Sequence, residues 1–252
     1  MGKVHLVIPD SHAHPDYNNK RANWLSKLIL DLKPDVVINM GDMWDMPSMN
    51  SFEAGKKTWG RDYKKDIDAG LDFDDRLWHA VRRAKKKKPR AVFIEGNHEH
   101  RLARILNDKP ELEGLISYND FDLKRNYNDV VLYDGGTPGI ITLDGISYAH
   151  FHVSGVMGKP IGGIHQAYGL TQKLGVSATM GHTHTRGFAE IKHPAGPPRL
   201  GMVCGVFQDY KSPWAGGVND VWWSGVVIKR EVENGVYDHQ WVSIDALKKE
   251  YT

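Results

Sequence analysis

Cysteine is almost absent from this sequence. Its 252 residues include one cysteine, Cys204, which excludes an intrachain disulfide and a metal cluster built on several thiolates, and this usage favours a reducing compartment. Long apolar runs are missing too: none approaches the ~20 residues that span a bilayer, and the amino terminus lacks the basic region and long apolar core of a secretory signal. We therefore expect a cytoplasmic protein with no membrane partner.

An excess of either charge is also missing. The 33 Lys and Arg residues nearly balance 31 Asp and Glu residues, for a formal net charge of +2 at pH 7, so bulk electrostatics give no reason to expect tight binding to nucleic acid. With 40% hydrophobic residues, a chain of this length can bury a full core. No internal repeat, low-complexity stretch or linker divides it, and we predict one domain over residues 1–252.

The first half alternates strand and helix patterns. Residues 4–9 form a strand-like run, residues 19–32 an amphipathic helix pattern, residues 66–88 a second helix pattern and residues 91–95 another strand. This order is typical of parallel strands joined by helices. The lysine run at 85–88 is interpreted as the solvated last turn of the second helix, where the helix dipole favours cations.

The stretch from Asp35 to Asp45, D-V-V-I-N-M-G-D-M-W-D, is the centre of the pattern. Its β-branched residues predict a strand buried on both faces, and Gly41 then lets the backbone turn sharply and place Asp42 at the strand's end. A carboxylate at the carboxyl end of a parallel strand can bridge two divalent cations. Asp42 is therefore the strongest single candidate for a metal ligand.

The pattern of the second half predicts a hairpin over residues 139–149 with an Asp144-Gly145 turn, a helix over 165–174 and a short strand over 177–180. Strands are predicted over 200–206, 221–229 and 235–244, with a hairpin turn signal at Asn234-Gly235. Residues 107–127 have a weak polar pattern and are interpreted as a connecting or lid segment, so the role of residues 108–128 stays open. Trp214, Trp222, Trp223 and Trp241 could stack on nucleobases, but packing on a sheet is the favoured interpretation.

Polar side chains with metal-binding atoms follow the predicted strands. Asp10 and His12 are two residues apart, so in an extended segment both would face the same side; the alternative is a local turn with His12 at the surface. The full candidate set is Asp10, His12, Asp42, Asn97, His150, His182 and His184. Mixed nitrogen and oxygen ligands suit Mn²⁺, Fe or Zn²⁺ better than Ca²⁺.

Two positions keep alternatives open. Residues 96–101, G-N-H-E-H-R, suit a phosphate at the start of a helix, although Asn97 could be a helix cap and Glu99 a first-turn acid. In His150-Phe151-His152 either histidine could be the ligand, with His150 preferred because it directly follows the strand.

Taken in order, the motifs D-S-H, G-D-M-W-D, G-N-H-E, a strand-end histidine and G-H-T-H resemble the calcineurin-like metallophosphoesterase family over residues 4–184. The resemblance implies an α/β fold, a four-layer αββα sandwich of two mixed β-sheets flanked by helices. It also implies two divalent metal ions, with Mn²⁺ preferred and Fe, Zn²⁺ or Ni²⁺ as alternatives. Asp10, His12 and His184 would hold the first ion, Asn97, His150 and His182 the second, and Asp42 both. His98 would be the catalytic residue beside the phosphate, protonating the leaving group or stabilising charge.

In such a site, the two metals and a bridging hydroxide would hydrolyse phosphate esters without a protein nucleophile. Asp45 and Glu99 are predicted to orient ligand histidines. Asn97, His98, Arg101, His14 and His152 are candidate substrate contacts, although His14 and His152 could be surface imidazoles and Arg101 could instead pair with an acid.

One departure from the family pattern narrows the function, and the general likeness to the nuclease and phosphodiesterase branches of the family supports the finer expectation. Protein phosphatases of this superfamily read G-D-x-V-D-R-G at the second motif, whereas Met46-Pro47 follow Asp45 here, which disfavours that activity. We expect a phosphodiesterase or nuclease whose partner is a phosphate ester in DNA, RNA or a nucleotide. A phosphomonoesterase is the alternative, and a non-catalytic metal-binding scaffold a third. Any nucleic-acid groove would draw on Lys56, Lys57, Arg61, Lys64, Lys65, Arg101 and Arg104. The oligomeric state is left open.

Overall fold

Two β-sheets stacked face to face form the centre of the molecule. The structure is a computed structural model that describes residues 2–50 and 62–252. The first sheet has the strand order β13 (Val236–Ser243), β12 (Gly225–Glu233), β1 (Lys3–Ile8), β2 (Val36–Asn39), β3 (Arg90–Ile94) and β4 (Asp129–Val131). Strands β1 to β4 run parallel, whereas β12 pairs antiparallel with both β1 and β13. The sheet is therefore mixed.

The second sheet is mixed as well. Its order is β10 (Arg186–His193), β11 (Gly196–Cys204), β9 (Ser177–Met180), β6 (Ile146–Ala149) and β5 (Ile141–Leu143). Strand β9 is parallel to both β6 and β11, and the two outer pairs are antiparallel. A two-stranded ribbon, β7 (Val153–Ser154) with β8 (Lys159–Pro160), lies outside both sheets.

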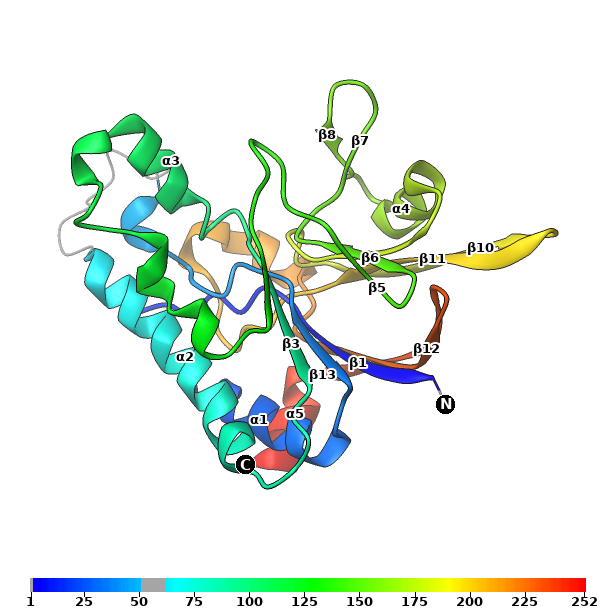
Figure 1. Ribbon diagram of the computed structural model, residues 1–252, viewed down its shortest axis with the longest axis horizontal. Helices are drawn as coiled ribbons and strands as arrows, with labels where there is room; N and C mark the ends of the chain where they lie inside the picture. The colour runs from blue at the N-terminus through cyan, green and yellow to red at the C-terminus, as the bar shows by residue number, and fades with distance from the viewer. Residues whose placement is uncertain (1, 51–61) are drawn as a thin grey trace.

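Helices cover the outer faces of the two sheets (Figure 1). Helices α1 (Lys20–Leu32), α2 (Tyr63–Arg83) and α5 (Ile244–Tyr251) pack on the first sheet in one core cluster, and α4 (Gln166–Leu174) packs on the second sheet in another. Along β1, Leu6 and Ile8 enter the helix-side core and Val7 the core between the sheets, as the alternation of side chains along a strand requires. The predicted four-layer αββα sandwich is confirmed.

Some element predictions were wrong. Helix α2 ends at Arg83 with Ala84 as its C-cap, so the lysines at 85–88 lie beyond it and are not its last turn. Strand β12 begins at Gly225, not at Val221 as predicted, because Val221 ends the 3₁₀ segment η6 (Pro213–Val221) and residues 222–224 connect the two elements. Strand β10 and helix α5 were not predicted.

The segment at 107–127, whose sequence pattern is weak and polar, contributes to the core. It contains short 3₁₀ turns, and its side chains Phe121, Leu123 and Tyr127 are buried in the helix-side cluster. The Tyr127 hydroxyl donates a hydrogen bond to Asp74 of α2 at 2.9 Å. This part of the segment packs like a core element, so it is not a lid.

Among the described residues, no helix is both long enough and apolar enough to cross a membrane. The division into domains stays a prediction.

Candidate metal centre

The carboxyl ends of five strands deliver the candidate ligands to one edge of the sandwich. Asp10 follows β1, Asp42 follows β2 and Asn97 follows β3, and these strands are parallel neighbours. In the second sheet, His150 directly follows β6 and His182 follows its parallel neighbour β9. Because both sheets present these ends together, side chains far apart in sequence meet.

Left-handed backbone conformations aim several of these side chains. His12, Asp42, His182 and His184 have φ values of 42°, 48°, 66° and 59°, a region that residues other than glycine seldom adopt. The extended segment expected for Asp10 and His12 was therefore wrong, although both residues do reach the same cluster. Such strained positions concentrate at functional sites.

Two glycines allow the close approach of the acidic ligands. A Cβ on Gly96 would lie 2.2 Å from Asp42 Oδ1, and a Cβ on Gly181 would lie 2.3 Å from Asp10 Oδ1. Both distances are too short for any side chain, so the glycines of the G-N-H-E and G-H-T-H motifs are needed for packing against the two carboxylates.

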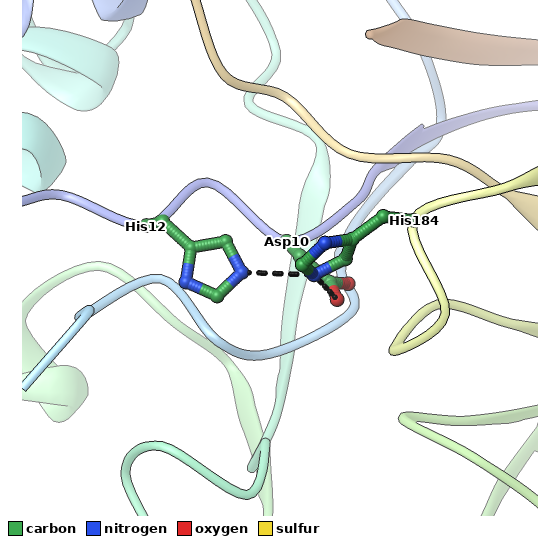
Figure 2. A group of neighbouring side chains, drawn as sticks. All are labelled: Asp10, His12 and His184. Carbon is green, nitrogen blue, oxygen red and sulfur yellow. Dashed lines mark hydrogen bonds and ion pairs between the residues drawn. The ribbon is translucent and has the colours of Figure 1, made fainter. Parts of the chain in front are cut away.

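The first group of candidate ligands consists of Asp10, His12 and His184 (Figure 2). His12 Nε2 lies 3.0 Å from His184 Nε2, and His184 Nε2 lies 3.2 Å from Asp10 Oδ2. Asp10 Oδ1 is buried and has no hydrogen-bond partner among the described residues. Two converging imidazole nitrogens beside a buried carboxylate fit a divalent cation.

The second group consists of Asp42, His150 and His182. His150 Nδ1 donates to the Met40 carbonyl at 2.8 Å, which leaves Nε2 facing the group. His150 Nε2 lies 3.4 Å from Asp42 Oδ2 and 3.0 Å from Asn97 Oδ1. His150, not His152, is therefore placed as a ligand would be.

Asp42 connects the groups, because it also lies with His12 and His98 in a third set. Burial alone would lower the pKa of His150, but the negative charges of Asp42 and Asp10 prevail and raise it to about 10. The concentration of buried negative charge thus attracts a positive one, as a cation site must.

His98 is fixed from three sides. Its backbone N–H donates to Asp42 Oδ1 at 2.8 Å, its Nδ1 donates to the Asp45 carbonyl at 2.6 Å, and its Nε2 accepts from Arg101 Nη2 at 2.9 Å. Burial, helped by the charge of Arg101, lowers the pKa of His98 to about 4 against the opposing charge of Asp42. In this arrangement Nε2 accepts from Arg101 and carries no proton, so the geometry suits charge stabilisation by the Arg101 guanidinium, which His98 positions, better than proton donation by His98.

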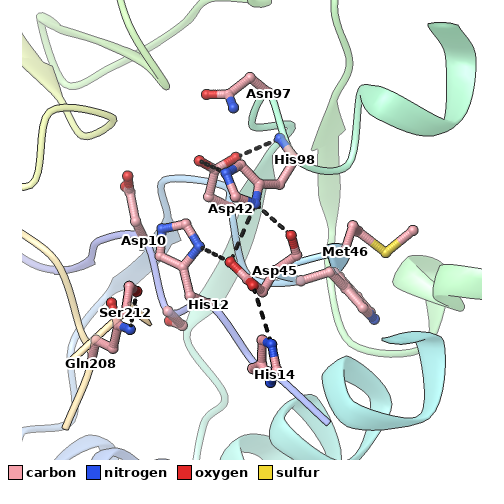
Figure 3. Close-up of polar contacts among 12 residues, drawn as sticks. Asp10, His12, His14, Asp42, Asp45, Met46, Asn97, His98, Gln208 and Ser212 are labelled. Atoms are coloured by element: carbon pink, nitrogen blue, oxygen red, sulfur yellow. Dashed lines mark hydrogen bonds and ion pairs between the residues drawn. The ribbon is translucent and has the colours of Figure 1, made fainter. Parts of the chain in front are cut away.

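Asp45 contacts three histidines (Figure 3). Its carboxylate lies 2.9 Å from His12 Nδ1, 3.5 Å from His98 Nδ1 and 3.8 Å from His14 Nε2. The first contact directs His12 Nε2 toward the candidate cation. The expectation that Asp45 orients a ligand histidine agrees with this geometry.

Glu99 has a different role from the one expected. Its buried carboxylate accepts the backbone N–H groups of Asp42 at 2.9 Å, Trp44 at 2.9 Å and Gly96 at 3.0 Å. It therefore holds the turn that carries Asp42, and does not orient a histidine. The sequence could not show this role because two of the three partners, the backbone N–H groups of Asp42 and Trp44, belong to a distant segment.

Arg101 donates through Nη1 to the carbonyls of Asp45 and Met46 at 2.9 and 3.2 Å. It is thus anchored to the backbone beyond Asp42, while it also lines the cleft beside the candidate ligands. That position keeps a substrate contact available to it.

The cleft has a volume of about 730 Å³ and is lined by Asp42, Asn97, His98, His182 and His184 among others. His14 lines it as well, as predicted for a substrate contact. His152 does not: its side chain is 1% exposed and belongs to the interior, so a substrate contact through it was a wrong expectation. Of the predicted basic groove, Lys65 and Arg101 line the cleft, and Lys56, Lys57 and Arg61 lie outside the described residues.

Three aromatic side chains line the cleft, Tyr17, Tyr210 and Trp214, and sequence reasoning missed the two tyrosines. Trp214 had been singled out, but its packing interpretation does not fit its exposure, which is 55%.

Comparisons with known proteins relate this chain to a phage protein and to solved structures. No protein-family model matches it. The Gene 54 protein of Mycobacterium phage D29 is 26% identical over 192 residues, which cover 74% of this chain and 71% of the relative. The layers, strand order and motif positions carry the assignment of the fold. The chain has the four-layer αββα sandwich that its motifs predicted.

Two solved structures align with nearly the whole of this fold. TT1561 of Thermus thermophilus is 10% identical with a TM-score of 0.39, covering 97% of this chain and 100% of that one. Yfce, a phosphoesterase from E. coli, is 13% identical with a TM-score of 0.40, covering 96% and 99%. At these scores the alignments add nothing to the geometry of the site.

Proposed function

We propose that this protein is a phosphoesterase that depends on two divalent cations, and that it hydrolyses phosphodiesters of nucleic acids or nucleotides. The observation that carries the proposal is the position of Asp42. Asp42 belongs to the second group, with His150 and His182, and to the third set, with His12 and His98. Because His12 is also a member of the first group, Asp42 lies between the two proposed ligand sets. A carboxylate placed between two ligand sets is what a two-metal site requires.

Each residue has a defined part in this proposal. Asp10, His12 and His184 would hold one cation, Asn97, His150 and His182 the other, and Asp42 would contact both. The cations, when bound, supply positive charge to the phosphoryl oxygens and activate water for in-line attack. Arg101, oriented by its 2.9 Å hydrogen bond to His98 Nε2, would stabilise charge on the phosphoryl group from the side of the cleft. The mixture of imidazole, carboxylate and amide donors favours Mn²⁺, with Fe, Zn²⁺ and Ni²⁺ as alternatives.

The charge of the cleft does not decide between a diester and a monoester. Besides Asp42 and Asp45, the carboxylates of Asp16, Asp62 and Asp66 line it, together with the basic side chains Lys65 and Arg101. A phosphomonoesterase is therefore the alternative that the turnover measurement separates from a phosphodiesterase.

Turnover of bis-p-nitrophenyl phosphate and p-nitrophenyl phosphate tests the proposal, with Mn²⁺ and with chelator, for the wild type and Asp42→Asn. We expect metal-dependent diester cleavage that falls by more than about 100-fold in the variant, because several kcal/mol of charge stabilisation are lost. Asp68→Asn, an exposed acid on α2 outside the cleft lining, is the matched control. Preferential monoester cleavage would redirect the substrate assignment, and absence of turnover with every metal would contradict the enzymatic role.

A further inference from the structure

An exposed indole stands beside the candidate metal centre. Trp214 lies on η6, lines the cleft and is 55% exposed. Its ring centroid is 5.7 Å from that of Trp222, and Trp222 contacts His184 edge to face at 4.3 Å and 88°. A flat aromatic surface is thus separated from a candidate ligand by a single side chain.

The segment that carries Trp214 is held in place by its own hydrogen bonds. The Asn219 side chain donates to the Ser212 carbonyl at 2.9 Å and accepts the Ser212 N–H at 2.8 Å. The backbone N–H of Trp223 donates to the His184 carbonyl at 3.0 Å, which joins this segment to the G-H-T-H turn. Trp214 is therefore positioned relative to the metal centre before any ligand arrives, and such preorganisation lowers the entropic cost of binding.

Further aromatic rings line the same cleft. Tyr17 and Tyr210 are stacked at 3.8 Å with an interplanar angle of 10°, and the Tyr210 hydroxyl donates to the His12 carbonyl at 2.6 Å. This pair is tied to the other histidine of the first ligand group. The space next to the candidate cations is therefore bordered by π surfaces as well as by carboxylates.

A packing role accounts for Trp222 but not for Trp214. Trp222 fills the space between His184 and Trp214, whereas more than half of the Trp214 surface remains exposed. A ligand whose phosphate binds at the cations would have its next chemical group near this indole. The cleft volume of about 730 Å³ is in the range that accommodates a nucleotide-sized ligand.

We propose that Trp214, supported by Trp222, is the stacking platform for a nucleobase, so that the substrates of this site are phosphate esters that carry a nucleoside. The inference rests on the proposed phosphoesterase function and specifies its substrate class. Every base offers a π face, so the platform selects nucleoside esters over alkyl esters without strong preference for one base.

The test compares two diesters with the same leaving group: the p-nitrophenyl ester of thymidine 5′-phosphate and methyl p-nitrophenyl phosphate. For Trp214→Ala we expect KM for the thymidine ester to rise roughly 5- to 150-fold with kcat nearly unchanged, and the methyl ester to be unaffected. Trp214→Phe should restore most of the loss, because a phenyl ring also stacks. Val218→Ala, an exposed residue of the same segment, is the matched control.

The outcomes separate this inference from the proposed function. If Trp214→Ala affects both esters equally, or affects neither, Trp214 is not a stacking platform, and the proposed phosphoesterase function still stands. If neither ester is hydrolysed with any metal, the proposed function fails, and calorimetric binding of thymidine 5′-phosphate to the wild type and Trp214→Ala then decides the platform alone. Inhibition by thymidine 5′-phosphate and by a short oligothymidylate, each measured in the wild type and Trp214→Ala, distinguishes a free nucleotide from a single strand as the ligand. Weaker inhibition of the variant by one of these compounds supports the platform.

Discussion

The buried carboxylate of Glu99 accepts a hydrogen bond from the backbone N–H of Asp42 at 2.9 Å. Two more backbone N–H groups, those of Trp44 and Gly96, donate to the same carboxylate. Three donors from two segments thus converge on one acceptor that has no protons in its charged form. The conformation of Asp42, whose φ of 48° is unusual for aspartate, depends on this arrangement.

Replacing Glu99 by Gln puts an amide N–H against backbone N–H groups. We expect a loss of about 1–3 kcal/mol in the free energy of unfolding, because a buried donor becomes unsatisfied, together with weaker metal binding because the Asp42 turn relaxes. Urea unfolding and Mn²⁺ titration measure the two effects. Glu111→Gln, on an exposed turn, is the control. Wild-type values for both quantities in Glu99→Gln would contradict this role.

Asp45→Asn tests the orientation of His12. The amide keeps the size of the carboxylate but loses the charge that holds His12 Nδ1 at 2.9 Å. We expect metal affinity to fall by about 10- to 100-fold, the usual cost of losing such a partner. Asp16→Asn is the matched control, because Asp16 is 82% exposed and its 3.9 Å contact is with His14. Unchanged affinity measured by calorimetry would show that His12 is positioned without Asp45.

The close approach of Gly181 to Asp10 gives a steric prediction. Gly181→Ala places a methyl group 2.3 Å from Asp10 Oδ1, so the carboxylate or the G-H-T-H turn must move. We expect loss of metal-dependent turnover by more than about tenfold, since an ångström-scale displacement of a ligand is costly. Gly136→Ala meets no atom within 4 Å and should behave as wild type. Full activity of Gly181→Ala would mean that Asp10 is not held where a ligand is needed.

Local sequence predicted the elements whose pattern is set by short-range chemistry. The strand at Ser177–Met180 and the Asp144-Gly145 hairpin turn were found because apolar runs and turn residues are visible in a short window. The candidate ligands were found because each lies shortly after such a run. Their convergence followed from the parallel order of the strands.

Long-range contacts set what the sequence could not predict. Phe121 and Leu123 lie in a polar segment and are buried because helices and the first sheet leave space for them. The role of Glu99 depends on three backbone partners. The exposure of Trp214 depends on the 3₁₀ conformation of Pro213–Val221, a segment that lies between the strands predicted at 200–206 and 221–229.

The pH dependence of stability has a specific source in His5. This fully buried residue bonds Tyr148 Oη through Nδ1 at 2.9 Å and Asp144 Oδ2 through Nε2 at 3.0 Å. Burial first, then the charge of Lys229, lowers the pKa of His5 from 6.5 to about 4, against the effect of Asp144. Because the folded protein binds this proton less tightly than the unfolded chain, the contribution of His5 is complete above pH 6.5 and is lost as the pH falls toward 4.

Comparison of the wild type with His5→Gln isolates this contribution. The free energy of unfolding of the wild type should fall relative to the variant by up to about 3 kcal/mol between pH 6.5 and 4. His79→Gln, an exposed histidine on α2, should track the wild type. A constant difference between the wild type and His5→Gln over this range would exclude His5 as the titrating group.

The most direct test of the central claim is the electron paramagnetic resonance spectrum of the protein loaded with Mn²⁺, read together with the number of ions bound. A carboxylate shared by two cations couples their spins, so we predict about two Mn²⁺ per chain with an exchange-coupled spectrum. Asp42→Asn should lose the coupling, and Asp68→Asn should keep it. A wild-type protein that binds a single ion, or two ions with uncoupled spectra, would contradict a two-metal centre bridged by Asp42.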